Sequence, residues 1–127
     1  MTAAVRVTGI DHIVLITPDV ERALAFYTQV LGLAAERVDE WRAGAVPFPS
    51  VRINDGSLID LLAGERTGEN LAHVCLVIEP TDLGVLAGDE RLAPVTGPFD
   101  GLFGARGLAA SLYVQDPDGN TIELRSY

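Results

Sequence analysis

Hydrophobic and polar positions follow one order twice along this chain. In the first half, an apolar run within residues 8–17 predicts a β-strand that is covered on both faces. Residues 19–31 carry apolar side chains at helical spacing and end at Gly32, which predicts a helix with a glycine cap. Shorter stretches near 33–41, 45–53 and 57–63 complete this half as strands.

The second half repeats this order. A strand is predicted over 72–78, a short helical stretch follows Pro80 and ends at Gly88, and strands are predicted near 92–96, 108–115 and 121–126. The segment 97–107 carries four glycines and one proline, which predicts a mobile loop. Residues 64–70 are polar and form the expected linker between the halves.

Two βαβββ modules, at about 8–63 and 71–126, therefore make up one α+β domain over residues 8–126. Each module provides a four-stranded sheet with one apolar face for its helix. The other face becomes a wall of a cup only if a second curved sheet supplies the opposite wall. We expect the two mixed sheets to pair in this way around a ligand cavity.

A short phrase marks the repeat more sharply than the elements do. The pattern D-G-x-x-I-acid-L occurs at residues 55–61 and again at 118–124. Each half opens with a histidine on an apolar run, His12 or His73, and closes with an acid, Asp60 or Glu123. These are the only two histidines of the chain. Two imidazoles and two carboxylates at equivalent places predict a site for a divalent metal.

Composition limits the partners. The chain of 127 residues carries 18 acidic and 9 basic side chains, all nine of them arginine, for a formal net charge of −9. This charge repels phosphate backbones, so we expect no nucleic-acid partner. No apolar run reaches the roughly 20 residues that span a bilayer, so we expect no membrane partner. The single cysteine, Cys75, fits a reducing compartment, and we expect a cytoplasmic protein.

Four segments carry a family resemblance that covers about residues 8–126. They are the Asp-His pair at 11–12, the segments 25–27 and 30–33 around the end of the predicted helix, and the segment YVQDPDGNTIEL at 113–124. With them the chain resembles the vicinal oxygen chelate superfamily. Its members include glyoxalase I, extradiol dioxygenases, fosfomycin-resistance proteins, methylmalonyl-CoA epimerase and bleomycin-binding proteins.

The resemblance implies a metal bound by the first and last strands of each module, which are the positions of His12, Asp60, His73 and Glu123. Asp60 is one methylene shorter than the Glu or Gln usual at its position, so direct ligation, contact through water and a role as base all stay open for it. The implied ion is Zn, Ni, Mn, Co or Fe. In short chains of this family a partner subunit can supply the second module, so a homodimer is also implied.

The expected function is a metal-dependent enzyme for a small oxygenated substrate. Glyoxalase-like or epimerase-like lyase and isomerase chemistry is favoured, in which Glu123 or Asp60 removes a proton next to a carbonyl and the metal stabilises the enediolate. The alternatives are an extradiol-type dioxygenase on a two-His, one-carboxylate site, a thiol transferase that modifies an antibiotic, and a drug-binding protein of the bleomycin-resistance type without catalysis.

Three residues are predicted to contact substrate. Arg106, at the end of the glycine-rich segment, suits a substrate carboxylate or phosphate, with a surface salt bridge as its alternative. Ser111 and Tyr113 alternate with apolar neighbours, as does Gln115, so they share a polar strand face that lines the cup or contacts solvent. Cys75 shares strand parity with His73, which leaves a place facing the cavity or a place as core filler.

Overall fold

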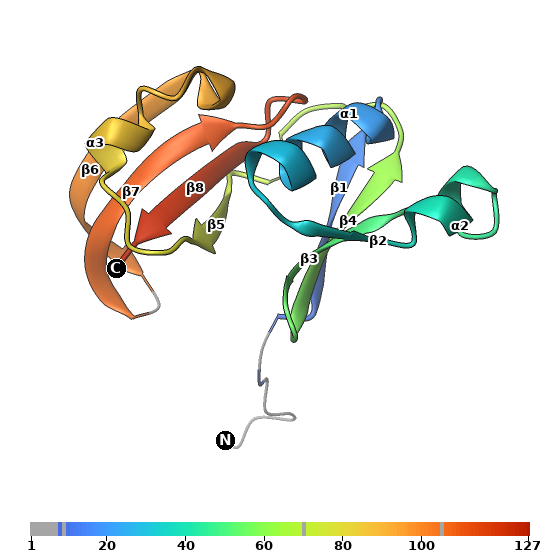
Figure 1. The fold of residues 1–127 in the computed structure, drawn as a ribbon, viewed down its shortest axis with the longest axis horizontal. Helices are drawn as coiled ribbons and strands as arrows, with labels where there is room; N and C mark the ends of the chain where they lie inside the picture. Colours follow the sequence, from blue (N-terminus) through green and yellow to red (C-terminus); the bar gives the residue numbers. More distant parts are fainter. Residues whose placement is uncertain (1–7, 9, 70, 105) are drawn as a thin grey trace. The chain divides into compact units, whose positions relative to one another are not determined.

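The computed structural model describes residues 8, 10–69, 71–104 and 106–127 (Figure 1). Residue 9 of the predicted first strand, residue 70 of the predicted linker and residue 105 of the predicted loop lie outside the described residues. The chain forms two compact units, the first ending at Arg66 and the second beginning at Thr67. Each unit holds one four-stranded sheet.

The first unit contains one mixed sheet and three short helices. Its strands lie in the order β1-β4-β3-β2, with β1 parallel to β4 and the other pairs antiparallel. The elements are β1 (His12–Thr17), α1 (Val20–Ala25), η1 (Phe26–Val30), β2 (Ala34–Glu36), α2 (Val38–Arg42), β3 (Ser50–Asn54) and β4 (Ser57–Ala63).

The predicted helix over 19–31 begins and ends where the sequence indicates. The Asp19 side chain accepts a hydrogen bond from the backbone N–H of Arg22 at 3.0 Å, which caps α1. The last five helical residues, η1, adopt π-helical geometry, and the N–H of Leu31 bonds to the carbonyl of Phe26. Gly32 then takes a φ of +74°, a conformation that glycine adopts without strain.

The apolar core of this unit lies between its sheet and its helix. Alternate residues of the strands point to the covered face, because successive side chains of a strand face opposite ways. The tightly buried members of this core are Leu15, Val20, Ala23, Leu24, Tyr27, Val51, Ile59 and Leu61. The opposite face of the sheet carries His12, Asp60 and Ser50 together with the exposed apolar side chains of Val14 and Ile16.

The second unit repeats the plan. Its strands lie in the order β5-β8-β7-β6, again with the first strand parallel to the last. The elements are β5 (Val74–Val77), α3 (Leu83–Leu86), η2 (Glu90–Leu92), β6 (Val95–Gly104), β7 (Gly107–Gln115) and β8 (Thr121–Ser126). The buried apolar side chains are Leu76, Leu83, Leu92, Leu112, Val114, Ile122 and Leu124.

Two local predictions were wrong. The segment 97–107 is not a loop, because β6 runs through Gly104 and pairs with β7 as an antiparallel hairpin. Two of its glycines, Gly97 and Gly101, lie at the two register shifts and take φ values of +99° and +67°. Such positive φ values accommodate irregularities in a ladder, so the glycines bend a strand here instead of ending it. The stretch 33–41 is only partly strand, since α2 follows β2.

The α+β class with a repeated βαβββ order is confirmed. Within the part of the chain that the structure describes, no helix is long and apolar enough to cross a membrane.

Replacing Ile59 by Ala tests the core of the first unit. Ile59 is 0% exposed on an inner strand, so the variant should lose about 2–5 kcal/mol in the free energy of unfolding. The control Val14→Ala changes a side chain that is 46% exposed on the other face and should cost under about 1 kcal/mol. Denaturant unfolding measures both, and equal losses would contradict the assignment of faces.

Candidate metal centre

The open face of the first sheet gathers a histidine, a carboxylate and a serine. Asp60 of β4 has Val14 of β1 and Ser50 of β3 as its register partners on the two neighbouring strands. These three side chains therefore share one face. His12 lies two residues before Val14 and therefore points the same way. Strand register alone thus brings together side chains that are far apart in the sequence.

Asp60 is a buried carboxylate with its two oxygens used differently. The residue is only 6% exposed. The hydroxyl of Ser50 donates to Oδ1 at 2.6 Å. The other oxygen, Oδ2, lies 3.8 Å from Nε2 of His12. The serine therefore fixes the carboxylate while one oxygen stays directed toward the imidazole.

Asp11 orients the imidazole of His12 through the ring nitrogen that faces away from Asp60. Its Nδ1 lies 2.7 Å from Oδ2 of Asp11. This hydrogen bond raises the pKa of His12 above its ordinary value, burial opposes the rise, and the charges of Asp60 and Asp11 add to it. In the neutral imidazole, a proton on Nδ1 leaves the lone pair on Nε2, the atom that faces Asp60. A carboxylate behind a ligating histidine is a common arrangement at metal sites.

The second unit shows the same arrangement around Glu123, which is 6% exposed. The hydroxyl of Ser111 donates to Oε2 at 2.8 Å. The other oxygen, Oε1, lies 3.3 Å from Nε2 of His73. Again a serine holds one carboxylate oxygen and the imidazole faces the other.

Glu123 has two further neighbours that can donate to it: Cys75, where Val14 lies beside Asp60, and Tyr113, which holds the register position of Ser50 opposite Asp60. Cys75 and Tyr113 flank Glu123 in the sheet and both donate hydrogen bonds to it. Burial raises the pKa of Glu123, but the hydrogen bonds from Ser111, Cys75 and Tyr113, with the nearby His73, outweigh burial and hold the pKa below its usual value. Glu123 is therefore a stable anion on this face.

The structure places most of the predicted site residues together within their own units. It brings His12 to Asp60, His73 to Glu123, and both Ser111 and Tyr113 to Glu123. Arg106 lies elsewhere, exposed at the β6–β7 turn, with its guanidinium 4.2 Å from the ring centre of Tyr127.

Cys75 is exposed on the face of Glu123, so a place as core filler is wrong.

Three residues of the site were missed by the sequence analysis. Asp11 carried a signal, since it adjoins His12. Arg125 could have been placed on the Glu123 face by strand parity. Ser50 gave no signal, because its place opposite Asp60 depends on a strand register that the sequence does not reveal.

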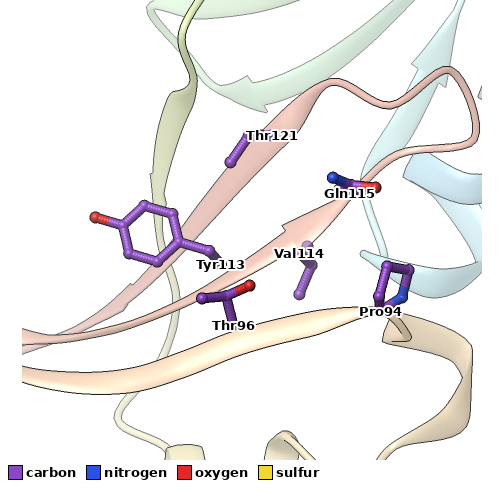
Figure 2. A pocket seen from close by; sticks show the side chains of 6 residues that line it. All are labelled: Pro94, Thr96, Tyr113, Val114, Gln115 and Thr121. Carbon is purple, nitrogen blue, oxygen red and sulfur yellow. The ribbon is translucent and has the colours of Figure 1, made fainter.

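A pocket opens beside the second pair, with a volume of about 180 Å³ (Figure 2). Its lining comes from β6, β7, β8 and the residue before β6, namely Pro94, Thr96, Tyr113, Val114, Gln115 and Thr121. Ligand pockets for drug-sized molecules usually measure roughly 300–1,000 Å³, so this pocket suits a small group. None of the described lining residues is charged, which favours an uncharged hydroxyl, carbonyl or amide group.

The donors fit a divalent transition metal in their chemistry. Imidazole nitrogen and carboxylate oxygen are ligands that Zn, Ni, Mn, Co and Fe accept. Each unit offers one of each, and both carboxylates are buried, which is costly without a compensating charge. Within the described residues, however, no group of three or more His, Cys, Asp or Glu is gathered as a metal site. One unit alone therefore offers two donors.

Comparison with known proteins gives matches over most of the chain. The family model described as the Glyoxalase/Bleomycin resistance protein/Dioxygenase superfamily matches residues 9–84. Virulence protein STM3117 of Salmonella typhimurium is 30% identical over 122 residues, which covers 93% of this chain and 83% of that protein. Glyoxalase domain-containing protein RDO1 of Mycosarcoma maydis is 32% identical over 128 residues, with 95% and 69% covered.

Among solved structures, a glyoxalase/dioxygenase from Nostoc punctiforme is similar with a TM-score of 0.74. The match covers 99% of this chain and 95% of that chain at 23% identity. At this identity the likeness concerns the fold alone.

Alkylation of Cys75 tests the geometry around Glu123. The residue is exposed as a whole, but partial burial of its thiol raises the pKa of Cys75 to about 11, and the charge and hydrogen bond of Glu123 add to the rise. Because the thiolate is the nucleophile, modification by iodoacetamide at pH 8 should be about 100-fold slower than that of an ordinary thiol. Mass spectrometry of the single cysteine measures the rate against pH.

Two controls accompany this measurement. In denaturant the same cysteine should react at the ordinary rate. In Glu123→Gln the thiol should react faster than in the wild type, because a negative charge that opposes the thiolate is gone. An ordinary rate in the folded wild-type protein would contradict the contact between Cys75 and Glu123.

Proposed function

The chain belongs to the Glyoxalase/Bleomycin resistance protein/Dioxygenase superfamily, and from that premise we propose that it is a metal-dependent enzyme acting on a small oxygenated molecule. The observation that carries the proposal is the arrangement found in both units. In each, a buried carboxylate has one oxygen held by a serine and the other directed at Nε2 of a histidine. A purely structural ion pair does not require that a histidine and a carboxylate meet at two repeat-equivalent places.

The proposed ligands are His12, Asp60, His73 and Glu123. Each unit offers two donors, so the set needs a first and a second unit. From the family resemblance we propose that two chains assemble this set as a homodimer. Catalytic metal sites typically take three protein ligands and keep a position open. His12, His73 and Glu123 meet that requirement if Asp60 acts as a base. If Asp60 also ligates, the metal needs a higher coordination number to keep a position open.

When bound, the metal would supply Lewis-acid polarisation of two neighbouring substrate oxygens. Side chains of the protein would supply proton transfer and positioning. Asp60 and Glu123 are the two candidates to accept a proton from carbon next to a carbonyl. Ser50 and Ser111 hold these carboxylates in place by their hydrogen bonds. The reaction class is therefore lyase or isomerase chemistry of the glyoxalase or epimerase type.

Substrate contacts are proposed on the open face of the second sheet. Tyr113 contributes a hydroxyl next to Glu123 and also lines the pocket of Figure 2, together with Thr96, Gln115 and Thr121. This lining suits an uncharged part of the substrate. Arg106 does not line this pocket. Its exposed guanidinium suits a carboxylate or phosphate on another part of the substrate.

A second candidate function is metal-free binding of a small molecule. It is favoured by the finding that the described residues hold no cluster of three metal donors within a unit. A formal charge of −9 suits a cationic ligand. Metal analysis separates the two candidates.

Elemental analysis of protein purified without chelator should find close to one metal ion per complete site. His12→Ala and Glu123→Ala should both lose it, because each removes a donor from a different unit. Gln115→Ala, on the same face as Glu123 but outside the ligand set, is the matched control and should retain the metal. A wild-type protein that holds no metal and takes up no added Ni, Zn, Mn or Fe would contradict the proposal.

Proton removal is tested by isotope exchange. The metal-loaded protein should exchange hydrogen for deuterium next to the carbonyl of small hydroxy-carbonyl compounds in D2O, as followed by NMR. The variant that removes the proton acceptor, Asp60→Asn or Glu123→Gln, should slow exchange about 100-fold or more. Exchange at the wild-type rate in both variants would remove both acids from that role. Oxygen uptake with a catechol, or a thiol-dependent adduct, would instead identify the dioxygenase or thiol-transfer alternative.

A further inference from the structure

The two halves of the candidate site differ in charge at repeat-equivalent positions. The residue before the histidine is Asp11 in the first unit and Ala72 in the second. The residue two places after the acid is Leu62 in the first unit and Arg125 in the second. One half therefore carries an additional negative charge and the other an additional positive charge.

Arg125 is a buried cation in direct contact with Glu123. The residue is 2% exposed, and its Nη1 lies 3.5 Å from Oε2 of Glu123. Its Nη2 donates to the carbonyl oxygens of Leu102 at 2.6 Å and Gly107 at 2.7 Å. These carbonyls flank the turn of the β6–β7 hairpin. The guanidinium thus joins Glu123 to that turn.

Contact with Arg125 has two effects on Glu123. Oε2 is held by both Ser111 and Arg125, which leaves Oε1 as the oxygen that faces His73. The positive charge also offsets the negative charge of Glu123, so a cation is attracted less strongly to this pair. In the first unit, Asp11 adds a second negative charge next to His12, only 2.7 Å from its Nδ1.

We propose that the two histidine–carboxylate pairs are unequal partners in metal binding, with the pair in the first unit as the anchor and Arg125 as a positioning residue that holds Glu123 at the expense of cation affinity. This inference rests on the proposed metal-dependent function. It assigns to Asp11 the strengthening of His12 as a ligand, and to Arg125 the opposite effect on the other pair.

The test replaces Arg125 by Leu, the residue that the first unit carries at the equivalent position. Titration of the full chain with Ni²⁺ and with Zn²⁺ in a calorimeter measures the dissociation constant. Removing a positive charge this close to a ligand should tighten binding at least about tenfold. A merely structural role predicts the reverse, because disorder of Glu123 weakens binding. Arg125→Lys keeps the positive charge, so it should not tighten binding.

Substitutions at Ala72 and Asp11 test the same inference and leave the buried guanidinium of Arg125 unchanged. Ala72 is exposed, so Ala72→Asp places behind His73 the carboxylate that Asp11 provides behind His12. It should tighten metal binding several-fold, with Ala72→Asn as the uncharged control of the same size. Asp11→Asn should weaken binding several-fold. If Arg125→Leu fails to fold, as judged by circular dichroism, the affinities of the Ala72 and Asp11 variants test the inference.

The outcomes separate the inference from the proposed function. Tighter binding in Arg125→Leu or Ala72→Asp, with no tightening in the lysine or asparagine control, supports the inference. Unchanged or weaker binding in both charge variants overturns it while the metal site itself stands. Binding by Arg125→Leu alone, with none by the wild-type protein, would support the inference and refute metal dependence of the natural chain. Binding by no protein would overturn both.

Discussion

A carboxylate that is buried on a sheet face needs donors around it, and both units are organised around that need. Water cannot solvate Asp60 or Glu123 well, since each is 6% exposed. A serine hydroxyl and an imidazole compensate each charge. These contacts also determine which carboxylate oxygen stays available, so the same interactions that allow burial prepare the acids for a ligand.

The fold meets this need through its parallel strand pairs. In each unit the first strand lies directly beside the last, which places a residue near the start of the unit next to one near its end. The covered face takes the apolar side chains, and strand alternation then assigns the opposite face to the histidine and the acid. A short repeat in the sequence can therefore encode a site whose members are about fifty residues apart.

The sequence predicted what depends on alternation, repeats and local turn chemistry. It predicted the α+β class and the glycine cap at Gly32. It also singled out both histidines and both acids from the repeat, and in the structure each histidine faces the acid of its own unit. It could not predict features that depend on strand register, such as Ser50 opposite Asp60. It also mistook the glycines of β6 for a loop, because glycine marks bulges as readily as turns.

The two serines reach their acids by different routes. Ser50 lies directly across from Asp60, whereas Ser111 lies across from Arg125 and reaches Glu123 diagonally. The extra methylene of glutamate suits the longer diagonal span. Acid length and serine position therefore match each other within each unit. Exchanging Asp for Glu alone, in either half, would break this match.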